Sequence, residues 1–275
     1  MSVGLPQDGH SGNFINLFIF ILLVVVMFKL VMGDPKTLKN IMDAIVSLID
    51  EGPMEIDKEE VRVKAVDPSQ IAMVSLTIPK DAFMEYDVTE PVIVGLNFSN
   101  LVKILNRART GDKLELTLED NQFVVKFISK KRKRTFHVPV IETRDIIRKE
   151  PNVEPEAVVK MLCSAFKDSL KDAVLVSSYM ALEVHPDKFI FDAKGDSGKL
   201  VIEIEKDDEN IREFTCDQDS VRASFSIQYL ENIVKACPDT NVLELYLATN
   251  KALKIQYNID KAALKYYLAP RIEMD

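Results

Sequence analysis

The sequence carries a tandem duplication, and this limits the folds open to the chain more than its composition does. Four short patterns recur in the same order, at offsets of about 127 to 131 residues. They are Leu38-Lys39-(x)2-Met42-(x)3-Val46 with Phe166-Lys167-(x)2-Leu170-(x)3-Val174, Ala65–Leu76 with Ala193–Ile204, Phe98-Ser99 with Phe225-Ser226, and Phe136-(x)2-Pro139 with Tyr267-(x)2-Pro270. A chance likeness between amphipathic elements is the alternative, but the shared order favours two similar domains.

The chain of 275 residues is long enough for two domains of ordinary size. We expect them at residues 27–141 and 156–275. Residues 142–155 are charged and contain two prolines, which is typical of an extended connector.

The N-terminal segment differs in composition from the rest. Leu17–Phe28 is an unbroken apolar run, and it reaches Phe14–Met32 if Asn16 and Lys29 are tolerated. The clean run is shorter than a spanning helix requires, and Met1–Asn13 lacks the basic residues of a signal peptide. We therefore expect residues 1–26 to be an apolar appendage outside the fold. A membrane-associating segment at residues 14–32 is the alternative.

Both halves show the same succession of hydrophobic patterns, which predicts an α+β fold of mostly antiparallel sheet with two helices per domain. Helical spacing marks the segments Pro35–Ile49, Phe98–Thr110, Leu162–Val174 and Ile227–Cys237. Strand patterns mark Phe28–Met32, Val61–Ala65, Val74–Ile78, Leu114–Leu118, Phe123–Ile128, Arg134–Val140, Ala157–Met161, Val242–Leu247 and Leu253–Ile259. Asp34 before Pro35, and Asn97 before Phe98, are expected to cap their helices.

Composition argues against several classes of protein. The three cysteines are widely spaced and the three histidines are scattered, so neither a disulfide scaffold nor a zinc site is expected. No glycine-rich nucleotide loop occurs, and no acid–base pair is accompanied by a nucleophile or an oxyanion site. We expect no catalytic residue, no metal and no cofactor. The net charge of −8 excludes a uniformly basic nucleic-acid binder, although it leaves room for a local basic surface.

The predicted helices reverse the sign of the overall charge. They carry eight basic and four acidic residues within an acidic chain. Basic side chains gathered on one face can hold a polyanion through its phosphates. Ordinary solvated helix surfaces are the alternative, and no aromatic side chains accompany the lysines to stack on bases.

Two further charged segments stand out. Lys130–Arg134 is a run of five basic residues, which is typical of a localisation signal or nucleic-acid patch but also of a charged hairpin. Asp207-Asp208-Glu209 is expected in a polar loop and lacks the convergence that a metal site requires.

Three segments resemble PCNA (archaeal-type proliferating cell nuclear antigen), the family of DNA polymerase sliding clamps. Leu264–Glu273 resembles the ending of that family, Val66–Leu76 its central loop, and Arg134–Pro139 the strand before the connector in its archaeal members. The resemblance extends from about Met27 to Asp275. It implies the DNA-clamp fold and a head-to-tail homotrimer, a ring that encircles double-stranded DNA without reading its sequence and raises polymerase processivity.

The resemblance also implies site residues. The helices would line the hole, with basic side chains facing DNA at Lys39, Lys103, Arg107, Lys167, Lys171 and Lys235. A pocket under the connector would take short helical peptides of partners, which are DNA polymerase, the clamp loader, flap endonuclease and DNA ligase. Its lining would be Val66, Gln70, Ile71, Met73, Ala252, Tyr267, Ala269 and Pro270.

Alternatives remain for the role of the pocket residues and for the function of the whole protein. Ile71, Met73 and Tyr267 could instead fill a core. A membrane-anchored interaction protein is the alternative function, through the apolar N-terminal segment. The clamp interpretation implies a cytoplasmic protein located with the chromosomal DNA.

Overall fold

The computed structural model describes residues 27–143 and 149–272, and all strand pairs within them are antiparallel. Its first half runs β1 (Phe28–Met32), α1 (Pro35–Val46), β2 (Glu51–Ile56), β3 (Glu60–Val66), β4 (Ala72–Pro79), the short 3-10 helix η1 (Lys80–Ala82), β5 (Glu85–Val88), β6 (Val92–Asn97), α2 (Phe98–Leu105), β7 (Lys113–Glu119), β8 (Gln122–Ser129) and β9 (Arg132–Pro139).

The second half repeats this order, with a counterpart for every helix and strand except η1. Its elements are β10 (Ala157–Leu162), α3 (Cys163–Ala173), β11 (Tyr179–Val184), β12 (Lys188–Gly195), β13 (Gly198–Glu205), β14 (Ile211–Cys216), β15 (Val221–Ser226), α4 (Ile227–Val234), β16 (Val242–Leu247), β17 (Leu253–Ile259) and β18 (Ala262–Leu268). The predicted duplication and α+β class are confirmed.

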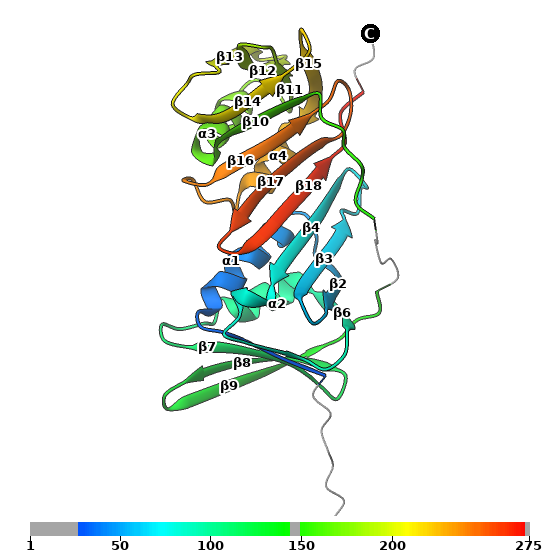
Figure 1. The fold of residues 1–275 in the computed structure, drawn as a ribbon, viewed down its shortest axis with the longest axis vertical. Coiled ribbons are helices and arrows are strands. Elements are labelled where there is room, and N and C mark those ends of the chain that lie inside the picture. The colour runs from blue at the N-terminus through cyan, green and yellow to red at the C-terminus, as the bar shows by residue number, and fades with distance from the viewer. Residues whose placement is uncertain (1–26, 144–148, 273–275) are drawn as a thin grey trace, which may run out of the picture.

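In the part of the chain that the structure describes, the strands form three sheets, and the middle one is shared by both halves (Figure 1). Its nine strands run β14-β10-β16-β17-β18-β4-β3-β2-β6, so that β18 of the second half pairs with β4 of the first. A five-stranded sheet, β5-β1-β7-β8-β9, and a four-stranded sheet, β13-β12-β11-β15, flank it. Each flanking sheet repeats the strand order of one part of the middle sheet. Consequently β9 and β13 are edges with no further strand beside them among residues 27–143 and 149–272, whereas their counterparts, β18 and β4, are joined.

The four helices lie on one side of the sheets, behind them in Figure 1. Neighbouring helices touch in the order α2, α1, α4, α3, so they form one layer across both halves. Their apolar faces are buried against the sheets through residues such as Leu38, Leu101, Phe166 and Leu230. The polar faces are therefore left on the outside of this layer.

Local chemistry explains where the first two helices begin. The Asp34 side chain accepts a hydrogen bond from the Lys36 amide at 2.9 Å, and Pro35 occupies the first turn of α1. Asn97 caps α2 in the same way, with the Asn100 amide as donor. Both predicted caps are confirmed.

The apolar N-terminal run lies almost wholly outside the described residues. Its last two, Met27 and Phe28, lead into and begin β1. Across 27–143 and 149–272, every helix is too short or too polar to cross a bilayer.

Candidate functional site

Three of the six predicted basic side chains have no ion pair in the described part of the chain. Lys103 and Arg107 belong to α2 and its end, and Lys235 ends α4. All three residues are exposed, and no carboxylate among the described residues lies within ion-pair distance of them. They are available to an external anion.

The other three predicted basic residues already have acidic neighbours. Lys39 pairs with Asp43 one turn along α1, and Lys171 pairs with Asp168 at 2.8 Å. Lys167 is the most enclosed, because its Nζ donates to the Cys237 carbonyl at 2.6 Å and to Asp239 at 2.7 Å.

These ion pairs shift the pKa values of two of the paired residues. The hydrogen bond from Lys167 lowers the pKa of Asp239, and the hydrogen bond to Asp168 raises the pKa of Lys171. The neighbouring carboxylates partly neutralise the positive field of Lys167 and Lys171.

Two grooves mark the helical face. One, of about 490 Å³, lies between α3 and α4 and brings together Lys167, Lys171 and Lys235. The other, of about 460 Å³, lies between α1 and α4, where Lys235 meets Asn40 and Asp43. Lys235 thus joins the two halves of the layer, whereas Lys103 and Arg107 stand apart on α2.

The opposite face of the middle sheet carries the predicted partner surface. Strand register places Val66 beside Met73, and Met73 beside Tyr267, in one row across β3, β4 and β18. The Ala269 amide donates to the Ile71 carbonyl at 2.9 Å, so the chain beyond β18 follows the loop before β4. These five residues, far apart in sequence, form one surface.

Exposure varies across this surface. Val66 and Ile71 are each 38% exposed, whereas Met73 and Tyr267 are each 6% exposed. Ala252 and Pro270 are partly exposed, and Ala269 and Gln70 are exposed. Val66 and Ile71 are therefore open to a partner, and Met73 and Tyr267 are covered.

Glu150, in the connector, covers Tyr267. Its carboxylate accepts hydrogen bonds from the Tyr267 hydroxyl at 2.7 Å and from Ser75 Oγ at 2.8 Å. Lys265 and Lys64 lie 3.4 and 3.7 Å away. Burial alone would raise the pKa of Glu150, but these hydrogen bonds and ammonium groups hold it below its ordinary value.

A groove of about 570 Å³ lies beside this surface. Val66 and Gln70 line it together with the start of the connector, Ile141 to Thr143. The connector approaches the sheet closely here, because a Cβ on Gly95 would lie 2.1 Å from the Ile141 carbonyl oxygen. Only a glycine in β6 permits this contact.

Asp67 holds the central loop, residues 66 to 72. It is 5% exposed, and its carboxylate accepts from the amides of Ser69, Ile71 and Ala72 at 2.6 to 3.0 Å. The Tyr229 hydroxyl, from α4 in the other half, donates to it at 2.7 Å. Burial opposes the charge, but these donors lower the pKa of Asp67.

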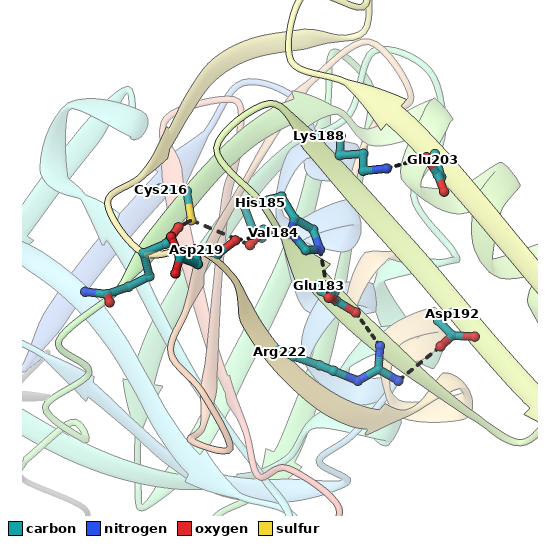
Figure 2. A network of polar contacts seen from close by, with 10 residues as sticks. Glu183, Val184, His185, Lys188, Asp192, Glu203, Cys216, Asp219 and Arg222 are labelled. Carbon is teal, nitrogen blue, oxygen red and sulfur yellow. Dashed lines mark hydrogen bonds and ion pairs between the residues drawn. The ribbon is translucent and has the colours of Figure 1, made fainter.

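A polar network lies on the four-stranded sheet (Figure 2). Arg222 donates to Glu183 and to Asp192, and the Nε2 of His185 lies 2.7 Å from Glu183. Burial would lower the pKa of Arg222, but its hydrogen bonds to the two carboxylates raise it. No group of three or more metal-ligating side chains occurs in the described part of the chain.

Sequence reasoning missed Glu150, Asp67 and Tyr229 as parts of the partner surface. The sequence could have pointed to Asp67, because an aspartate at the start of a polar loop commonly accepts hydrogen bonds from the backbone amides that follow it. Glu150 and Tyr229 had none, because only the fold brings the connector and α4 against the central loop.

Two family models match this chain, one in each half. The family model for the N-terminal domain of proliferating cell nuclear antigen matches residues 27–143, and that for its C-terminal domain matches residues 149–272. The chain is 34% identical over 248 residues to the DNA polymerase sliding clamp of Methanococcus maripaludis, covering 87% of this chain and 97% of that one.

A further relative and two solved structures are also similar to this chain. The DNA polymerase sliding clamp of Thermococcus gammatolerans is 30% identical over 247 residues, covering 90% of this chain and 99% of the relative. The solved structure of the C-terminal region of FEN-1 bound to A. fulgidus PCNA matches with a TM-score of 0.80 and 28% identity, over 90% of this chain and 100% of that one. PCNA from Thermococcus kodakaraensis gives a TM-score of 0.83 at 21% identity, over 89% and 100%, which shows the shared fold.

Proposed function

The chain belongs to the proliferating cell nuclear antigen family, and we propose that it works as a DNA polymerase sliding clamp, a ring that encircles duplex DNA and tethers replication and repair proteins. It acts by topology and docking, without a catalytic step. The observation that carries the proposal is the relationship between the joined and the unpaired sheet edges.

Inside the chain, β18 and β4 join the two halves into one sheet. Their counterparts β9 and β13 are unpaired edges at opposite ends of the molecule. Pairing β9 of one subunit with β13 of the next repeats the internal junction between chains. Such a head-to-tail contact either closes into a ring or grows into a filament. The family favours closure with three subunits, which place six similar domains around the hole.

The helical layer then lines the hole. We propose that Lys39, Lys103, Arg107, Lys167, Lys171 and Lys235 face the DNA phosphates. Contacts to phosphates carry no sequence information, so the ring can slide. The neighbouring acids Asp43, Asp168 and Asp239 weaken the attraction, and the closed ring rather than affinity holds the clamp on DNA.

The outer face of the middle sheet docks partners. We propose that Val66, Gln70, Ile71, Met73, Ala252, Tyr267, Ala269 and Pro270 receive a short helical peptide with apolar anchors. Val66 and Ile71 support this as exposed apolar side chains on one surface. The partners are DNA polymerase, the clamp loader, flap endonuclease and DNA ligase, and FEN-1 is the bound partner in one similar structure. This function places the protein in the cytoplasm with the chromosomal DNA.

Assembly and topology test the proposal together. Light scattering on the full chain should give the mass of a trimer, and a clamp loaded on nicked circular DNA should be released when that DNA is linearised. A monomer at micromolar concentration in moderate salt would overturn the ring. Equal retention on short open-ended and circular DNA would overturn encirclement.

A further inference from the structure

Two charged segments are not explained by sliding or by partner docking. The run Lys130–Arg134 forms the β8–β9 turn and the start of β9, on one unpaired edge. The acidic segment Asp207–Glu209 follows β13 after one residue, Lys206, on the other unpaired edge. Their opposite charges suggest that the basic segment of one subunit contacts the acidic segment of the next. Because the fold is duplicated, the internal junction between β18 and β4 shows which residues would face each other in that contact.

Each edge can be aligned with its joined counterpart by strand register. The β8–β9 turn closes with Ser129 opposite Arg132, as the β17–β18 turn closes with Ile259 opposite Ala262. Both turns contain two residues, so Lys131 occupies the position of Lys261.

The second alignment uses the strands that precede β4 and β13. Glu60 pairs with Pro79 as Lys188 pairs with Glu205. The next amides, those of Lys80 and Lys206, each donate at 2.8 Å to the strand before, to the Glu59 and Asp187 carbonyls respectively. Asp207 therefore occupies the position of Asp81.

At the internal junction these two positions form an ion pair. Lys261 Nζ lies 3.0 Å from an Asp81 carboxylate oxygen and donates to the Asp81 carbonyl at 2.8 Å. Ala263 pairs with Thr77 two residues further along. On the unpaired edges the same positions hold Lys131 and Asp207, and Lys133 and Glu203.

We propose that the basic turn of one subunit docks on the acidic end of β13 in the next, with Lys131 against Asp207 and Lys133 opposite Glu203. This charge pairing rests on the proposed ring and deepens it, because it fixes which edges meet and in which register. A basic edge repels another basic edge, so the charges also exclude head-to-head pairing.

Three of the four proposed partners, Lys131, Lys133 and Asp207, have no ion pair among the described residues of a single chain. Lys131 and Lys133 are exposed and have no carboxylate within ion-pair distance among the described residues, and the same holds for Glu205 and Asp207 towards bases. Arg134 is not part of the proposed contact, because its guanidinium already pairs with Asp112 and stacks on Phe127 in the same chain.

Glu203 already pairs with Lys188 at 2.7 Å (Figure 2). It therefore presents a shared rather than a free carboxylate to the next subunit. The reversal variants below use Glu205 in its place, because that change does not disturb a bond within the chain.

Charge reversal on the full chain tests the pairing. The basic-edge variant is Lys131→Glu with Lys133→Glu, and the acidic-edge variant is Glu205→Lys with Asp207→Lys. Each should raise the protein concentration at which half the trimer dissociates by about tenfold, the scale of close like charges at an interface. The four changes combined in one chain should restore assembly in part, because the two edges are then reversed everywhere except at Glu203, which stays acidic opposite position 133. Lys58→Glu and Glu90→Lys, exposed residues on neither edge, should leave the midpoint unchanged.

Analytical ultracentrifugation separates the outcomes. A monomeric wild type would overturn the ring itself. A trimeric wild type whose assembly neither reversal weakens, or whose combined variant stays as weak as the single-edge variants, would overturn the charge pairing and leave the ring standing.

Discussion

The hydroxyl of Tyr267 donates a hydrogen bond to Glu150 at 2.7 Å, across 117 residues of sequence. Tyr267 is the last residue but one of β18, the strand that joins the two halves, and Glu150 lies in the connector between them. Ser75 donates to the same carboxylate from β4. One half-buried acid thus ties the connector to both strands of the junction, beside the surface where partners are proposed to dock.

Removing the charge of Glu150 should loosen the connector. Glu150→Gln keeps the shape but loses the attraction to Lys64 and Lys265 and replaces one acceptor oxygen by a donor. Trypsin should then cleave faster after Lys149, as gel analysis over time would show. The control is Glu154→Gln, at a residue whose side chain bonds only Asn152 among the described residues, and it should be cleaved like the wild type. Equal rates in all three proteins would show that Glu150 does not hold the connector.

Shortening the partner surface should weaken peptide binding without opening the ring. Tyr267→Ala should cost about 1–3 kcal/mol of binding, the scale of an aromatic hot spot, and Ile71→Ser should act similarly through lost apolar contact. Isothermal titration with a clamp-binding peptide measures the affinity, and a sizing run measures assembly. Because Tyr267 is largely buried, the exposed Ile71 is the cleaner test.

The pattern of losses decides between surface and core. Trimer loss in step with peptide binding would mean that these residues hold the fold together. Wild-type affinity in both variants would mean that the peptide binds elsewhere.

Neutralising the helical face should weaken DNA-dependent work without unfolding the protein. The variant replaces five solvated basic residues by alanine, at Lys39, Lys103, Arg107, Lys171 and Lys235. Their contribution is electrostatic, so wild-type binding should fall steeply with salt and the variant should show a shallower slope. Polymerase stimulation on primed circular DNA is the readout. Full stimulation by the variant would rule out this face.

A graded comparison sharpens that test. Lys103 and Arg107 have no acidic partner in the described chain, whereas Lys171 is already paired with Asp168. We expect the double change at Lys103 and Arg107 to reduce stimulation more than Lys171→Ala alone. The opposite order would mean that the α3–α4 groove makes the closer DNA contact.

The sequence predicted the repeated architecture because periodicity and capping are local. Phe28–Met32, Val242–Leu247 and Leu253–Ile259 were predicted with the bounds that the structure has. The helix predicted to reach Ile49 ends earlier, at Val46, where Ser47 caps it. β2 was not predicted, since Gly52 and Pro53 break a strand pattern.

What the sequence could not supply is register between distant segments. The motif match set Phe136 against Tyr267, but the equal hairpin turns set Phe136 against Tyr266, one residue away. The sheet shared by both halves could not be predicted either, because its two joining strands, β4 and β18, are far apart in the sequence. For the same reason the basic residues could be named, but not their acidic neighbours across helices, such as Asp239 beside Lys167.

The bond between Asp67 and Tyr229 yields a prediction about stability and pH. Tyr229→Phe removes one of four donors to a buried carboxylate and should cost about 1–3 kcal/mol of the free energy of unfolding. Asp67→Asn should cost at least as much, because the neutral amide is a poorer acceptor. Urea unfolding of each variant measures both losses, with Glu90→Gln as an exposed control.

The pH dependence of the Asp67→Asn loss follows from the lowered pKa of Asp67. The pKa of an aspartate in the unfolded chain is about 3.9. Because the folded pKa lies below this, the carboxylate stabilises the protein fully above the unfolded value and loses that effect as pH falls through the folded one. The stability gap between wild type and Asp67→Asn should therefore stay constant from about pH 7 to 5 and narrow below about pH 4. A gap that widens on acidification would show that Asp67 is not held as a carboxylate by these donors.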